Sequence, residues 1–348
     1  MITLCDVRNC ERMDITELLA FTAKQGASDL HLSAGLPAMM RVDGEIRRLN
    51  APALEHEDVE RLLLAVMSEA QQKSFREALE IDFSVDVPGV SRFRVNAFHQ
   101  DRGVAGVFRT IPSHVPSLES LGLGDVFRRL ASCPHGLVLV TGPTGSGKST
   151  TLAAMVDHIN GARAQHVLTI EDPIEFVHYS RRALINQREV QRDTHDVASA
   201  LRSALREDPD VILVGEMRDL DTMRLALTAA ETGHLVLATL HTTSAARTVD
   251  RIVDVFPGEE KAMVRAMLSE SLQGVISQQL VRRIGGGRIA AHEILIATPA
   301  IRNLIREDKV AQIYSALQTG GGLGMQTMEA TLARLAAEGL ILREEHGG

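Results

Sequence analysis

Aromatic residues are scarce in this chain of 348 residues, which has no Trp, two Tyr and nine Phe. Its cores must therefore be built from Leu, Ile, Val, Ala and Met. The scarcity also removes the stacking platforms on which single-strand nucleic-acid binders hold bases. The formal net charge of −8 argues in the same direction, because phosphate backbones are bound mainly by clustered Lys and Arg. Local basic patches could still exist, but we expect no nucleic-acid partner.

Cysteines and long apolar runs are also few. The three cysteines, Cys5, Cys10 and Cys133, make no CxxC pair and no disulfide framework, which is typical of a reduced protein. The histidines show no HxxxH pair, so we expect no zinc site. No apolar run approaches the ~20 residues that span a bilayer, and the charged N-terminus lacks the apolar stretch of a signal peptide. We expect a cytoplasmic protein that could dock on a membrane complex.

The first third of the chain has the pattern of a small α+β domain. Asp14 opens a helix over 15–25 with a capping box, so residues 1–12 are expected to form a tail. Asp43-Gly44 predicts a hairpin turn. Strands and helices are mixed without βαβ alternation: strands are expected at 29–33, 38–42, 45–49, 81–87, 91–98 and 104–110, and helices at 57–69 and 71–79.

The pattern changes after residues 112–124, where two prolines and two glycines predict a linker. Short apolar strands now alternate with helices, which predicts a parallel sheet covered on both faces. These strands are expected at 137–140, 167–170, 211–214 and 235–240. Helices and one hairpin across 285–287 follow.

A phosphate-binding loop follows the first of these strands and opens a helix. It matches G-x-x-x-x-G-K-[ST], and we expect it to bind the phosphates of ATP through backbone N–H groups and the helix N-terminus. Lys148 would hold the β- and γ-phosphates, and the Ser149 hydroxyl would be a ligand of Mg²⁺. The loop consists of Gly142, Pro143, Thr144, Gly145, Ser146, Gly147, Lys148, Ser149 and Thr150.

Hydrolysis also requires a group that orients the attacking water. Glu216 ends the apolar strand 211–214 and is our candidate for this role, with a solvated strand-end carboxylate as the alternative. Gly215 occupies the position where many P-loop proteins place an Asp that holds the metal. Ser149 is therefore the one direct protein ligand to Mg²⁺ that we expect.

A second acidic cluster, Glu171-Asp172-Pro-Ile-Glu175, follows the strand 167–170. Ligands of open α/β sheets bind outside the carboxyl ends of the strands, so this cluster is expected beside the same phosphates. Either glutamate could support Mg²⁺ or the lytic water. His234 and His241 bracket the strand 235–240, and a His at its end could sense the γ-phosphate, with a hydrogen-bonded core His as the alternative.

These segments resemble the four boxes of secretion-superfamily ATPases: GPTGSGKST, TIEDPIEFVH, ALREDPDVILVGEMRD and TAAETGHLVLATLHTTSA. Residues 300–307, AIRNLIRE, resemble a signature of the PilT family of type IV pilus retraction ATPases. The resemblance covers nearly the whole chain, from about Met13 to beyond residue 335.

The resemblance implies a homohexamer with a PAS-like N-terminal domain over 13–111 and a RecA-like ATPase domain over 125–298. C-terminal helices would follow over 299–348. It also implies that Lys148, Glu175 and Glu216 are catalytic and that His234 and His241 belong to the His box. Arginines of the N-terminal domain would act in trans, and Arg94 and Arg109 are the best matches, with ordinary surface arginines as the alternative.

One difference from other members of the superfamily favours a pilus retraction ATPase over an assembly or secretion ATPase. Assembly and secretion ATPases carry a tetracysteine zinc module, whereas this chain has no cysteine after Cys133. The resemblance thus implies a motor that works on an inner-membrane platform protein, at the cytoplasmic side of the pilus machinery. Two alternatives stay open: an accessory retraction ATPase that assists a paralogue, and a RecA-like nucleic-acid motor.

Overall fold

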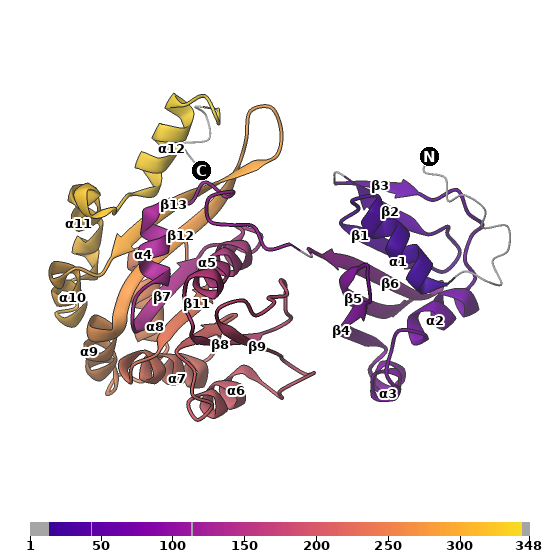
Figure 1. The fold of residues 1–348 in the computed structure, drawn as a ribbon, viewed down its shortest axis with the longest axis horizontal. Coiled ribbons are helices and arrows are strands. Elements are labelled where there is room, and N and C mark those ends of the chain that lie inside the picture. Colours follow the sequence, from indigo (N-terminus) through magenta and orange to yellow (C-terminus); the bar gives the residue numbers. More distant parts are fainter. Residues whose placement is uncertain (1–13, 43, 113, 343–348) are drawn as a thin grey trace. The chain divides into compact units, whose positions relative to one another are not determined.

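The chain divides into two compact units, Met1–His114 and Val115–Gly348, in a computed structural model that describes residues 14–42, 44–112 and 114–342 (Figure 1). The boundary between the units falls within the predicted linker at 112–124. The predicted tail at 1–12 and Asp43 of the predicted hairpin turn lie outside the described residues. No helix among the described residues is long and apolar enough to cross a membrane.

The first unit is a six-stranded antiparallel sheet with three helices, which confirms the α+β prediction. The strand order is β3-β2-β1-β6-β5-β4. Its elements are α1 (Ile15–Lys24), β1 (Asp29–Ser33), β2 (Met39–Val42), β3 (Glu45–Arg48), α2 (His56–Leu64), α3 (Glu69–Ala78), β4 (Glu80–Val87), β5 (Ser91–Gln100) and β6 (Gly103–Ile111). Asp14 caps α1 by accepting a hydrogen bond from the Thr16 N–H at 2.9 Å.

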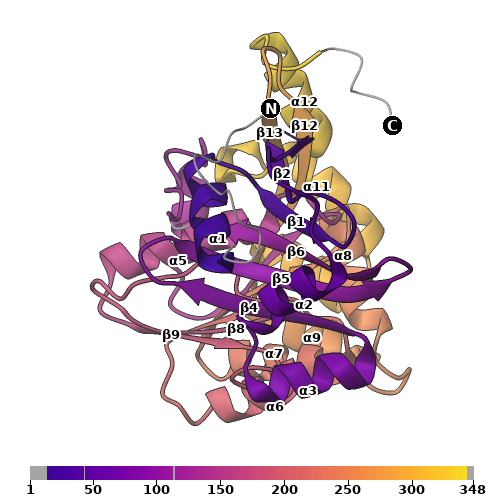
Figure 2. The same ribbon diagram turned by 90° about the vertical axis from the view of Figure 1, so that its right-hand side faces the viewer.

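Alternating side chains give the first sheet one apolar and one polar face. Leu30 and Phe108 are buried in one core with residues of α1 and α2, which lie over the strands in Figure 2. The residues next to them in sequence, Asp29 and Arg109, point to the other face because side chains alternate along a strand. Arg94 of β5 lies directly opposite Arg109 of β6 in the strand register, so its side chain is on the same polar face.

The second unit contains a seven-stranded sheet in the order β13-β12-β7-β11-β10-β8-β9. Six neighbouring strands are parallel and β13 is antiparallel at one edge. The elements are α4 (Asp125–Ala131), β7 (Gly136–Thr141), α5 (Lys148–Ala162), β8 (His166–Glu171), β9 (Leu184–Glu189), α6 (Val197–Ala204), β10 (Val211–Val214), α7 (Leu220–Glu231), β11 (Leu235–Leu240), α8 (Ala245–Asp254), α9 (Lys261–Ser271), β12 (Leu272–Arg282), β13 (Arg288–Ile296), α10 (Pro299–Arg306), α11 (Ile313–Thr319) and α12 (Met328–Ala337).

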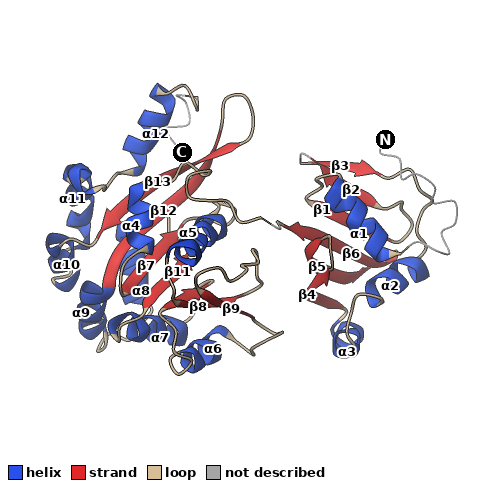
Figure 3. Cartoon of the chain, in the orientation of Figure 1, coloured by secondary structure: helices blue, strands red, loops and turns tan. Residues whose placement is uncertain are grey.

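Helices cover both faces of this sheet, as the wholly apolar strands predicted (Figure 3). Side chains of the central strands alternate between two cores. Val138 and Leu213 pack with α4 and α5, whereas Leu139 and Val214 pack with α6 to α9. The fold places the carboxyl ends of β7, β8, β10 and β11 along one edge, where the candidate site lies.

Two features of the second sheet differ from the sequence interpretation. The edge strand β9 was not predicted, because its sequence LINQRE is mostly polar and edge strands need no continuous apolar run. The hairpin across 285–287 was predicted and is formed by β12 and β13, but it also extends the seven-stranded sheet, since β12 pairs with β7.

Candidate active site

The phosphate loop joins two well-anchored elements. All six residues of β7 are buried, and α5, which has 15 residues, begins at Lys148. At Gly142 the backbone has φ of +145°, and a Cβ atom there would lie 2.1 Å from the backbone oxygen of Gln278. Gly147 has φ of +88°. The loop can therefore fold only with glycine at these places, and it presents the N-terminus of α5 to an anion.

The Lys148 side chain lies over this loop. Its Nζ donates hydrogen bonds to the carbonyl oxygens of Gly142 at 2.8 Å and Pro143 at 3.0 Å. Burial lowers the pKa of Lys148, whereas the carboxylates of Glu216 and Glu175 act to raise it. The ammonium thus lies within the field of both predicted catalytic acids.

Glu216 is held at the carboxyl edge of the sheet by two partners. Its Oε1 accepts from Nε2 of His241 at 2.7 Å, and its Oε2 lies 2.9 Å from Nη2 of Arg218. Burial alone raises the pKa of the Glu216 carboxyl, but Arg218 and His241 lower it, and the net pKa is below its ordinary value. The group is therefore an anchored carboxylate at neutral pH, with 22% of its side chain exposed.

The backbone around Glu216 explains the glycine that precedes it. A Cβ atom on Gly215 would lie 3.2 Å from the Ile170 oxygen and 3.3 Å from the Glu171 Cα. β8 therefore leaves little room for an Asp side chain at this position. Thr239 of β11 contacts the residues on both sides of Glu216. Its backbone oxygen accepts from the Met217 N–H, and its hydroxyl donates to the Gly215 oxygen, so the backbone at Glu216 is fixed.

Glu175 is an exposed residue of the loop after β8, which is tied to β9. Ile174 N–H donates to the Glu189 carboxylate at 3.1 Å. Gln187 donates to the Phe176 oxygen at 2.9 Å and accepts from the His178 N–H at 2.8 Å. The strand that the sequence interpretation missed thus holds the loop on which a predicted catalytic glutamate stands.

Glu171 differs from Glu175 in being partly buried and hydrogen-bonded within the sheet. Its Oε1 accepts from the Thr169 hydroxyl at 2.6 Å and from Gln187 Nε2 at 3.2 Å. Burial raises the pKa of this carboxyl from an ordinary value of 4.5 to about 7. Near neutral pH the protonated acid is well populated, so Glu171 is suited to hold the acidic loop in shape rather than to act as a permanent anion.

We expect the Glu171→Gln variant to change how stability depends on pH. The unfolded chain loses this proton near 4.5 and the folded chain near 7, so the folded state binds more protons between these values. The stability contributed by Glu171 therefore falls as the pH rises through this window. The unfolding midpoint of the nucleotide-free variant should decline less between pH 5 and pH 8 than that of the wild type, and parallel curves would contradict the assignment.

His234 lies at the opposite end of β11 from His241, so it does not reach Glu216 of its own chain, and its membership of the His box stays a prediction. It precedes β11 at the amino end, where its ring contacts the Ala229 oxygen at 3.0 Å and its carbonyl accepts from Gly136 N–H. His241 follows the carboxyl end of the same strand. Six strand residues at ~3.3 Å each separate the two by roughly 20 Å. Bracketing one strand therefore puts the two histidines at opposite edges of the sheet.

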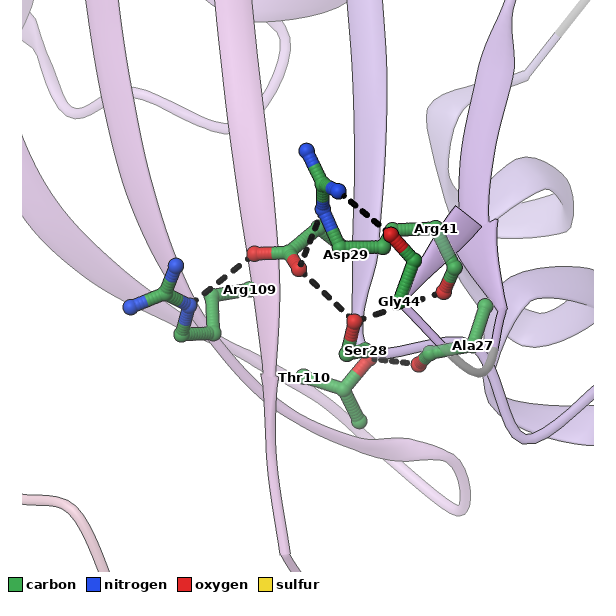
Figure 4. A network of polar contacts seen from close by, with 7 residues as sticks. All are labelled: Ala27, Ser28, Asp29, Arg41, Gly44, Arg109 and Thr110. Carbon is green, nitrogen blue, oxygen red and sulfur yellow. Dashed lines mark hydrogen bonds and ion pairs between the residues drawn. The ribbon is translucent and has the colours of Figure 1, made fainter. Parts of the chain in front are cut away.

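Arg94 and Arg109 both lie on the polar face of the first sheet, beside acidic partners. Arg109 donates from Nε to the buried Asp29 carboxylate at 2.9 Å, while 67% of its side chain is exposed (Figure 4). Arg41 and the Ser28 hydroxyl contact the same carboxylate. Arg94 is paired with Asp82 through two nitrogen–oxygen contacts of 2.9 and 3.2 Å. The two arginines are thus neighbours in one ordered cluster.

The residues of the AIRNLIRE segment form α10 and brace its neighbour. Ile301 and Ile305 are buried. Arg302 Nη1 donates to the backbone oxygens of Ser269 and Glu270 at the end of α9, each at 2.6 Å. Arg306 pairs with the Glu270 carboxylate. The motif therefore combines core packing with a cationic cap on the C-terminal end of α9.

The residues at the site suit Mg²⁺ bound together with a nucleotide. Among the described residues, no group of three or more His, Cys, Asp or Glu side chains is placed to hold a metal ion. Mg²⁺ keeps several waters and is commonly held by substrate phosphates with few protein ligands. Ser149, the second residue of α5, offers a hydroxyl at the phosphate loop for this purpose.

The sequence interpretation missed three residues that support the site: Arg218, Gln187 and Thr239. Arg218 had a signal, since it is a cation two residues after Glu216 at the same strand end. The roles of Gln187 and Thr239 depend on contacts with other strands and leave no local signal. The fold and the site together define a RecA-like P-loop ATPase.

Comparisons with known proteins identify the family within that class. A family model described as type II/IV secretion system protein matches residues 8–287. The chain is 71% identical over 332 residues to the type IV pilus retraction ATPase PilT of Pseudomonas aeruginosa, covering 95% of this chain and 96% of the relative. It is 58% identical over 337 residues to a twitching motility protein of Neisseria gonorrhoeae, covering 97% and 90%.

A solved structure agrees with these similarities. The crystal structure of the pilus retraction motor PilT with bound ADP has a TM-score of 0.91 against this chain, at 50% identity, and 96% of each chain is covered. The chain belongs to the type II/IV secretion system protein family, and the resemblance to its pilus retraction ATPases is confirmed.

Proposed function

We propose that this chain is a homohexameric ATPase motor that hydrolyses ATP with Mg²⁺ to retract type IV pili and so drive twitching motility. The observation that carries the proposal is the similarity along nearly the whole chain to a pilus retraction ATPase. The loop with Lys148 and the anchored carboxylate of Glu216 supply the two parts that ATP hydrolysis requires.

The proposed reaction uses residues of both the loop and the strand ends. Backbone N–H groups of 142–150 and the α5 N-terminus bind the phosphates, and Lys148 moves from the carbonyls of Gly142 and Pro143 to the β- and γ-phosphates. Ser149 would hold Mg²⁺, which would supply positive charge to the phosphate oxygens. Glu216 orients the attacking water, with Glu175 as a second acid near Lys148.

His241 has a position that suits communication with the γ-phosphate. It donates to Glu216 at 2.7 Å, and half of its side chain is exposed at the carboxyl edge. An imidazole that shares the water-orienting carboxylate can respond to the presence of the γ-phosphate or to its departure. Arg218 fixes the other oxygen of Glu216, so rotation of this carboxylate is restrained from both sides.

Arg94 and Arg109 would complete the site from a neighbouring subunit. A guanidinium supplied in trans stabilises charge in the transition state, so hydrolysis would depend on ring assembly. Motion of the two units about the linker at 112–124 would then convert hydrolysis into pulling. The motor would act at the cytoplasmic side of the inner membrane on a pilus platform protein, with a paralogous retraction ATPase as a possible further partner.

The test is complementation of a type IV piliated strain that lacks its own retraction ATPase. We expect this gene alone to restore twitching and the Glu216→Gln gene to fail, and native mass measurement should give a hexamer. Restoration only together with a paralogue would instead indicate an accessory subunit. ATPase activity that rises strongly on adding single-stranded DNA or RNA would indicate a nucleic-acid motor.

A further inference from the structure

Gln278 is a buried polar residue that touches the phosphate loop from a neighbouring strand. It lies on β12, which pairs with β7, and only 3% of it is exposed. Its Nε2 donates to the backbone oxygen of Ser146 at 2.6 Å. Its Oε1 accepts from the Thr151 hydroxyl of α5 at 2.7 Å. One side chain thus contacts both the loop and the helix that the loop opens.

A second donor fixes which way the Gln278 amide faces. Nε2 of His292 lies 3.0 Å from the same Oε1. Burial lowers the pKa of His292 to about 4, so the ring is neutral at pH 7 and its Nε2–H can donate. Phe127 packs edge-on against this ring, and the Thr331 hydroxyl donates to the backbone oxygen of His292 at 2.7 Å, so the ring has an aromatic neighbour and its strand is anchored.

With two donors on its oxygen, the amide must turn its NH₂ group to the Ser146 carbonyl. In a trans peptide the C=O and the following N–H point in opposite directions. Since the Ser146 carbonyl points at Gln278, the Gly147 N–H points away from β12. The absence of a side chain at Gly147 permits this close approach, because a Cβ atom there would lie 2.8 Å from Gln278 Nε2. The contact therefore sets the orientation of one peptide unit in the middle of the phosphate loop.

We propose that Gln278 is a positioning residue that locks the Ser146–Gly147 peptide so that the Gly147 N–H is ready to bind a nucleotide phosphate. The proposal rests on the proposed ATPase function. Without the amide, the free loop samples orientations in which this N–H is turned away. The apparent nucleotide affinity is then reduced in proportion to the fraction of molecules whose loop is in the binding orientation. Turnover of bound ATP is largely retained.

The test compares Gln278→Met with Gln279→Met in the full-length protein. Gln279 is the next residue of β12, and its side chain points to the opposite face of the sheet. For Gln278→Met we expect the Kd for ADP and the KM for ATP to rise on the order of tenfold, since a buried partner is lost. The kcat at saturation should stay near that of Gln279→Met, whereas the melting temperature should be lower, because the buried Thr151 hydroxyl and His292 Nε2–H lose their acceptor. Amide exchange at 145–148 should increase, while exchange in β11 is unchanged.

A merely structural role predicts another pattern: the melting temperature falls, but the folded protein keeps an unchanged ADP affinity and an unchanged KM for ATP. Gln278→Glu is a second variant of equal size that keeps the acceptor but places an oxygen against the Ser146 carbonyl, so it should weaken ADP binding at least as much. If neither variant folds, Thr151→Val takes their place in the ADP titration. It removes the Thr151 hydroxyl, one of the two donors that orient the Gln278 amide. Wild-type ADP affinity in the folded variants overturns the proposal, whereas a wild type that binds no ADP overturns the proposed function instead.

Discussion

In the Glu216→Gln variant we expect ATP hydrolysis to fall by about 10²- to 10⁴-fold while nucleotide binding persists. Gln has the same size and can still accept from His241, so the loop and the strand ends keep their places. It carries no charge to orient and polarise the water, and Arg218 loses its ionic partner. Because the role proposed for Glu216 is on the water and not on the bound phosphates, kcat should fall and the Kd for ADP should stay unchanged.

The measurement is steady-state ATPase activity together with ADP titration of the same preparations. Asp210→Asn is the matched control, since Asp210 lies at the amino end of the same strand, where it accepts from the His166 N–H at 2.8 Å. Asn keeps that acceptor, so activity close to the wild type is expected. If Glu216→Gln hydrolyses ATP normally, the water is oriented by another carboxylate, and Glu175 is the next to substitute.

The second large effect is expected at the arginine cluster of the first unit. Arg109→Ala should lower ATPase activity by about 10³-fold if its guanidinium completes the site of a neighbour. The fold should persist, because Asp29 keeps its contacts with Arg41 and with the Ser28 hydroxyl. Arg109→Lys should restore little, since an ammonium lacks the planar fork of the guanidinium.

Mixed rings test whether the arginine acts in trans. Co-expressed with the Glu216→Gln chain, the Arg109→Ala chain supplies Glu216 while its neighbour supplies the arginine. In random one-to-one rings of head-to-tail interfaces, about a quarter of the sites are then complete, so activity should recover toward that fraction of the wild type. No recovery above the two separate variants means that Arg109 does not act across an interface, and Arg94→Ala is then tested likewise.

Arg47→Ala is the control for this experiment. Arg47 is a partly exposed arginine of the same unit, on β3, with Glu45 3.7 Å away. Arg47→Ala removes the same positive charge as Arg109→Ala, but Arg47 is not among the residues that contact Asp29. Full activity of this variant, alone and in mixed rings, would show that loss of one positive charge on the first unit does not by itself slow hydrolysis.

Local patterns were sufficient to predict much of this protein. The wholly apolar strands at 211–214 and 235–240 were found within their observed limits, because buried parallel strands need unbroken apolar runs. The phosphate loop was equally readable, since its glycines, Lys148 and Ser149 lie within nine consecutive residues. Arg94 and Arg109 came from family resemblance, and their action in trans stays a prediction.

The sequence by itself therefore determined the strand–loop–helix of the proposed phosphate site and the acid at the end of a buried strand. Tertiary structure decided which histidine reaches that acid: His241 contacts Glu216, whereas His234 is at the far edge of the sheet. It also decided that Gln278 braces the loop at Ser146, across 132 positions of sequence. Short motifs encode contacts between near neighbours, but the partners of a loop or carboxylate come from whichever strand the sheet order places beside it.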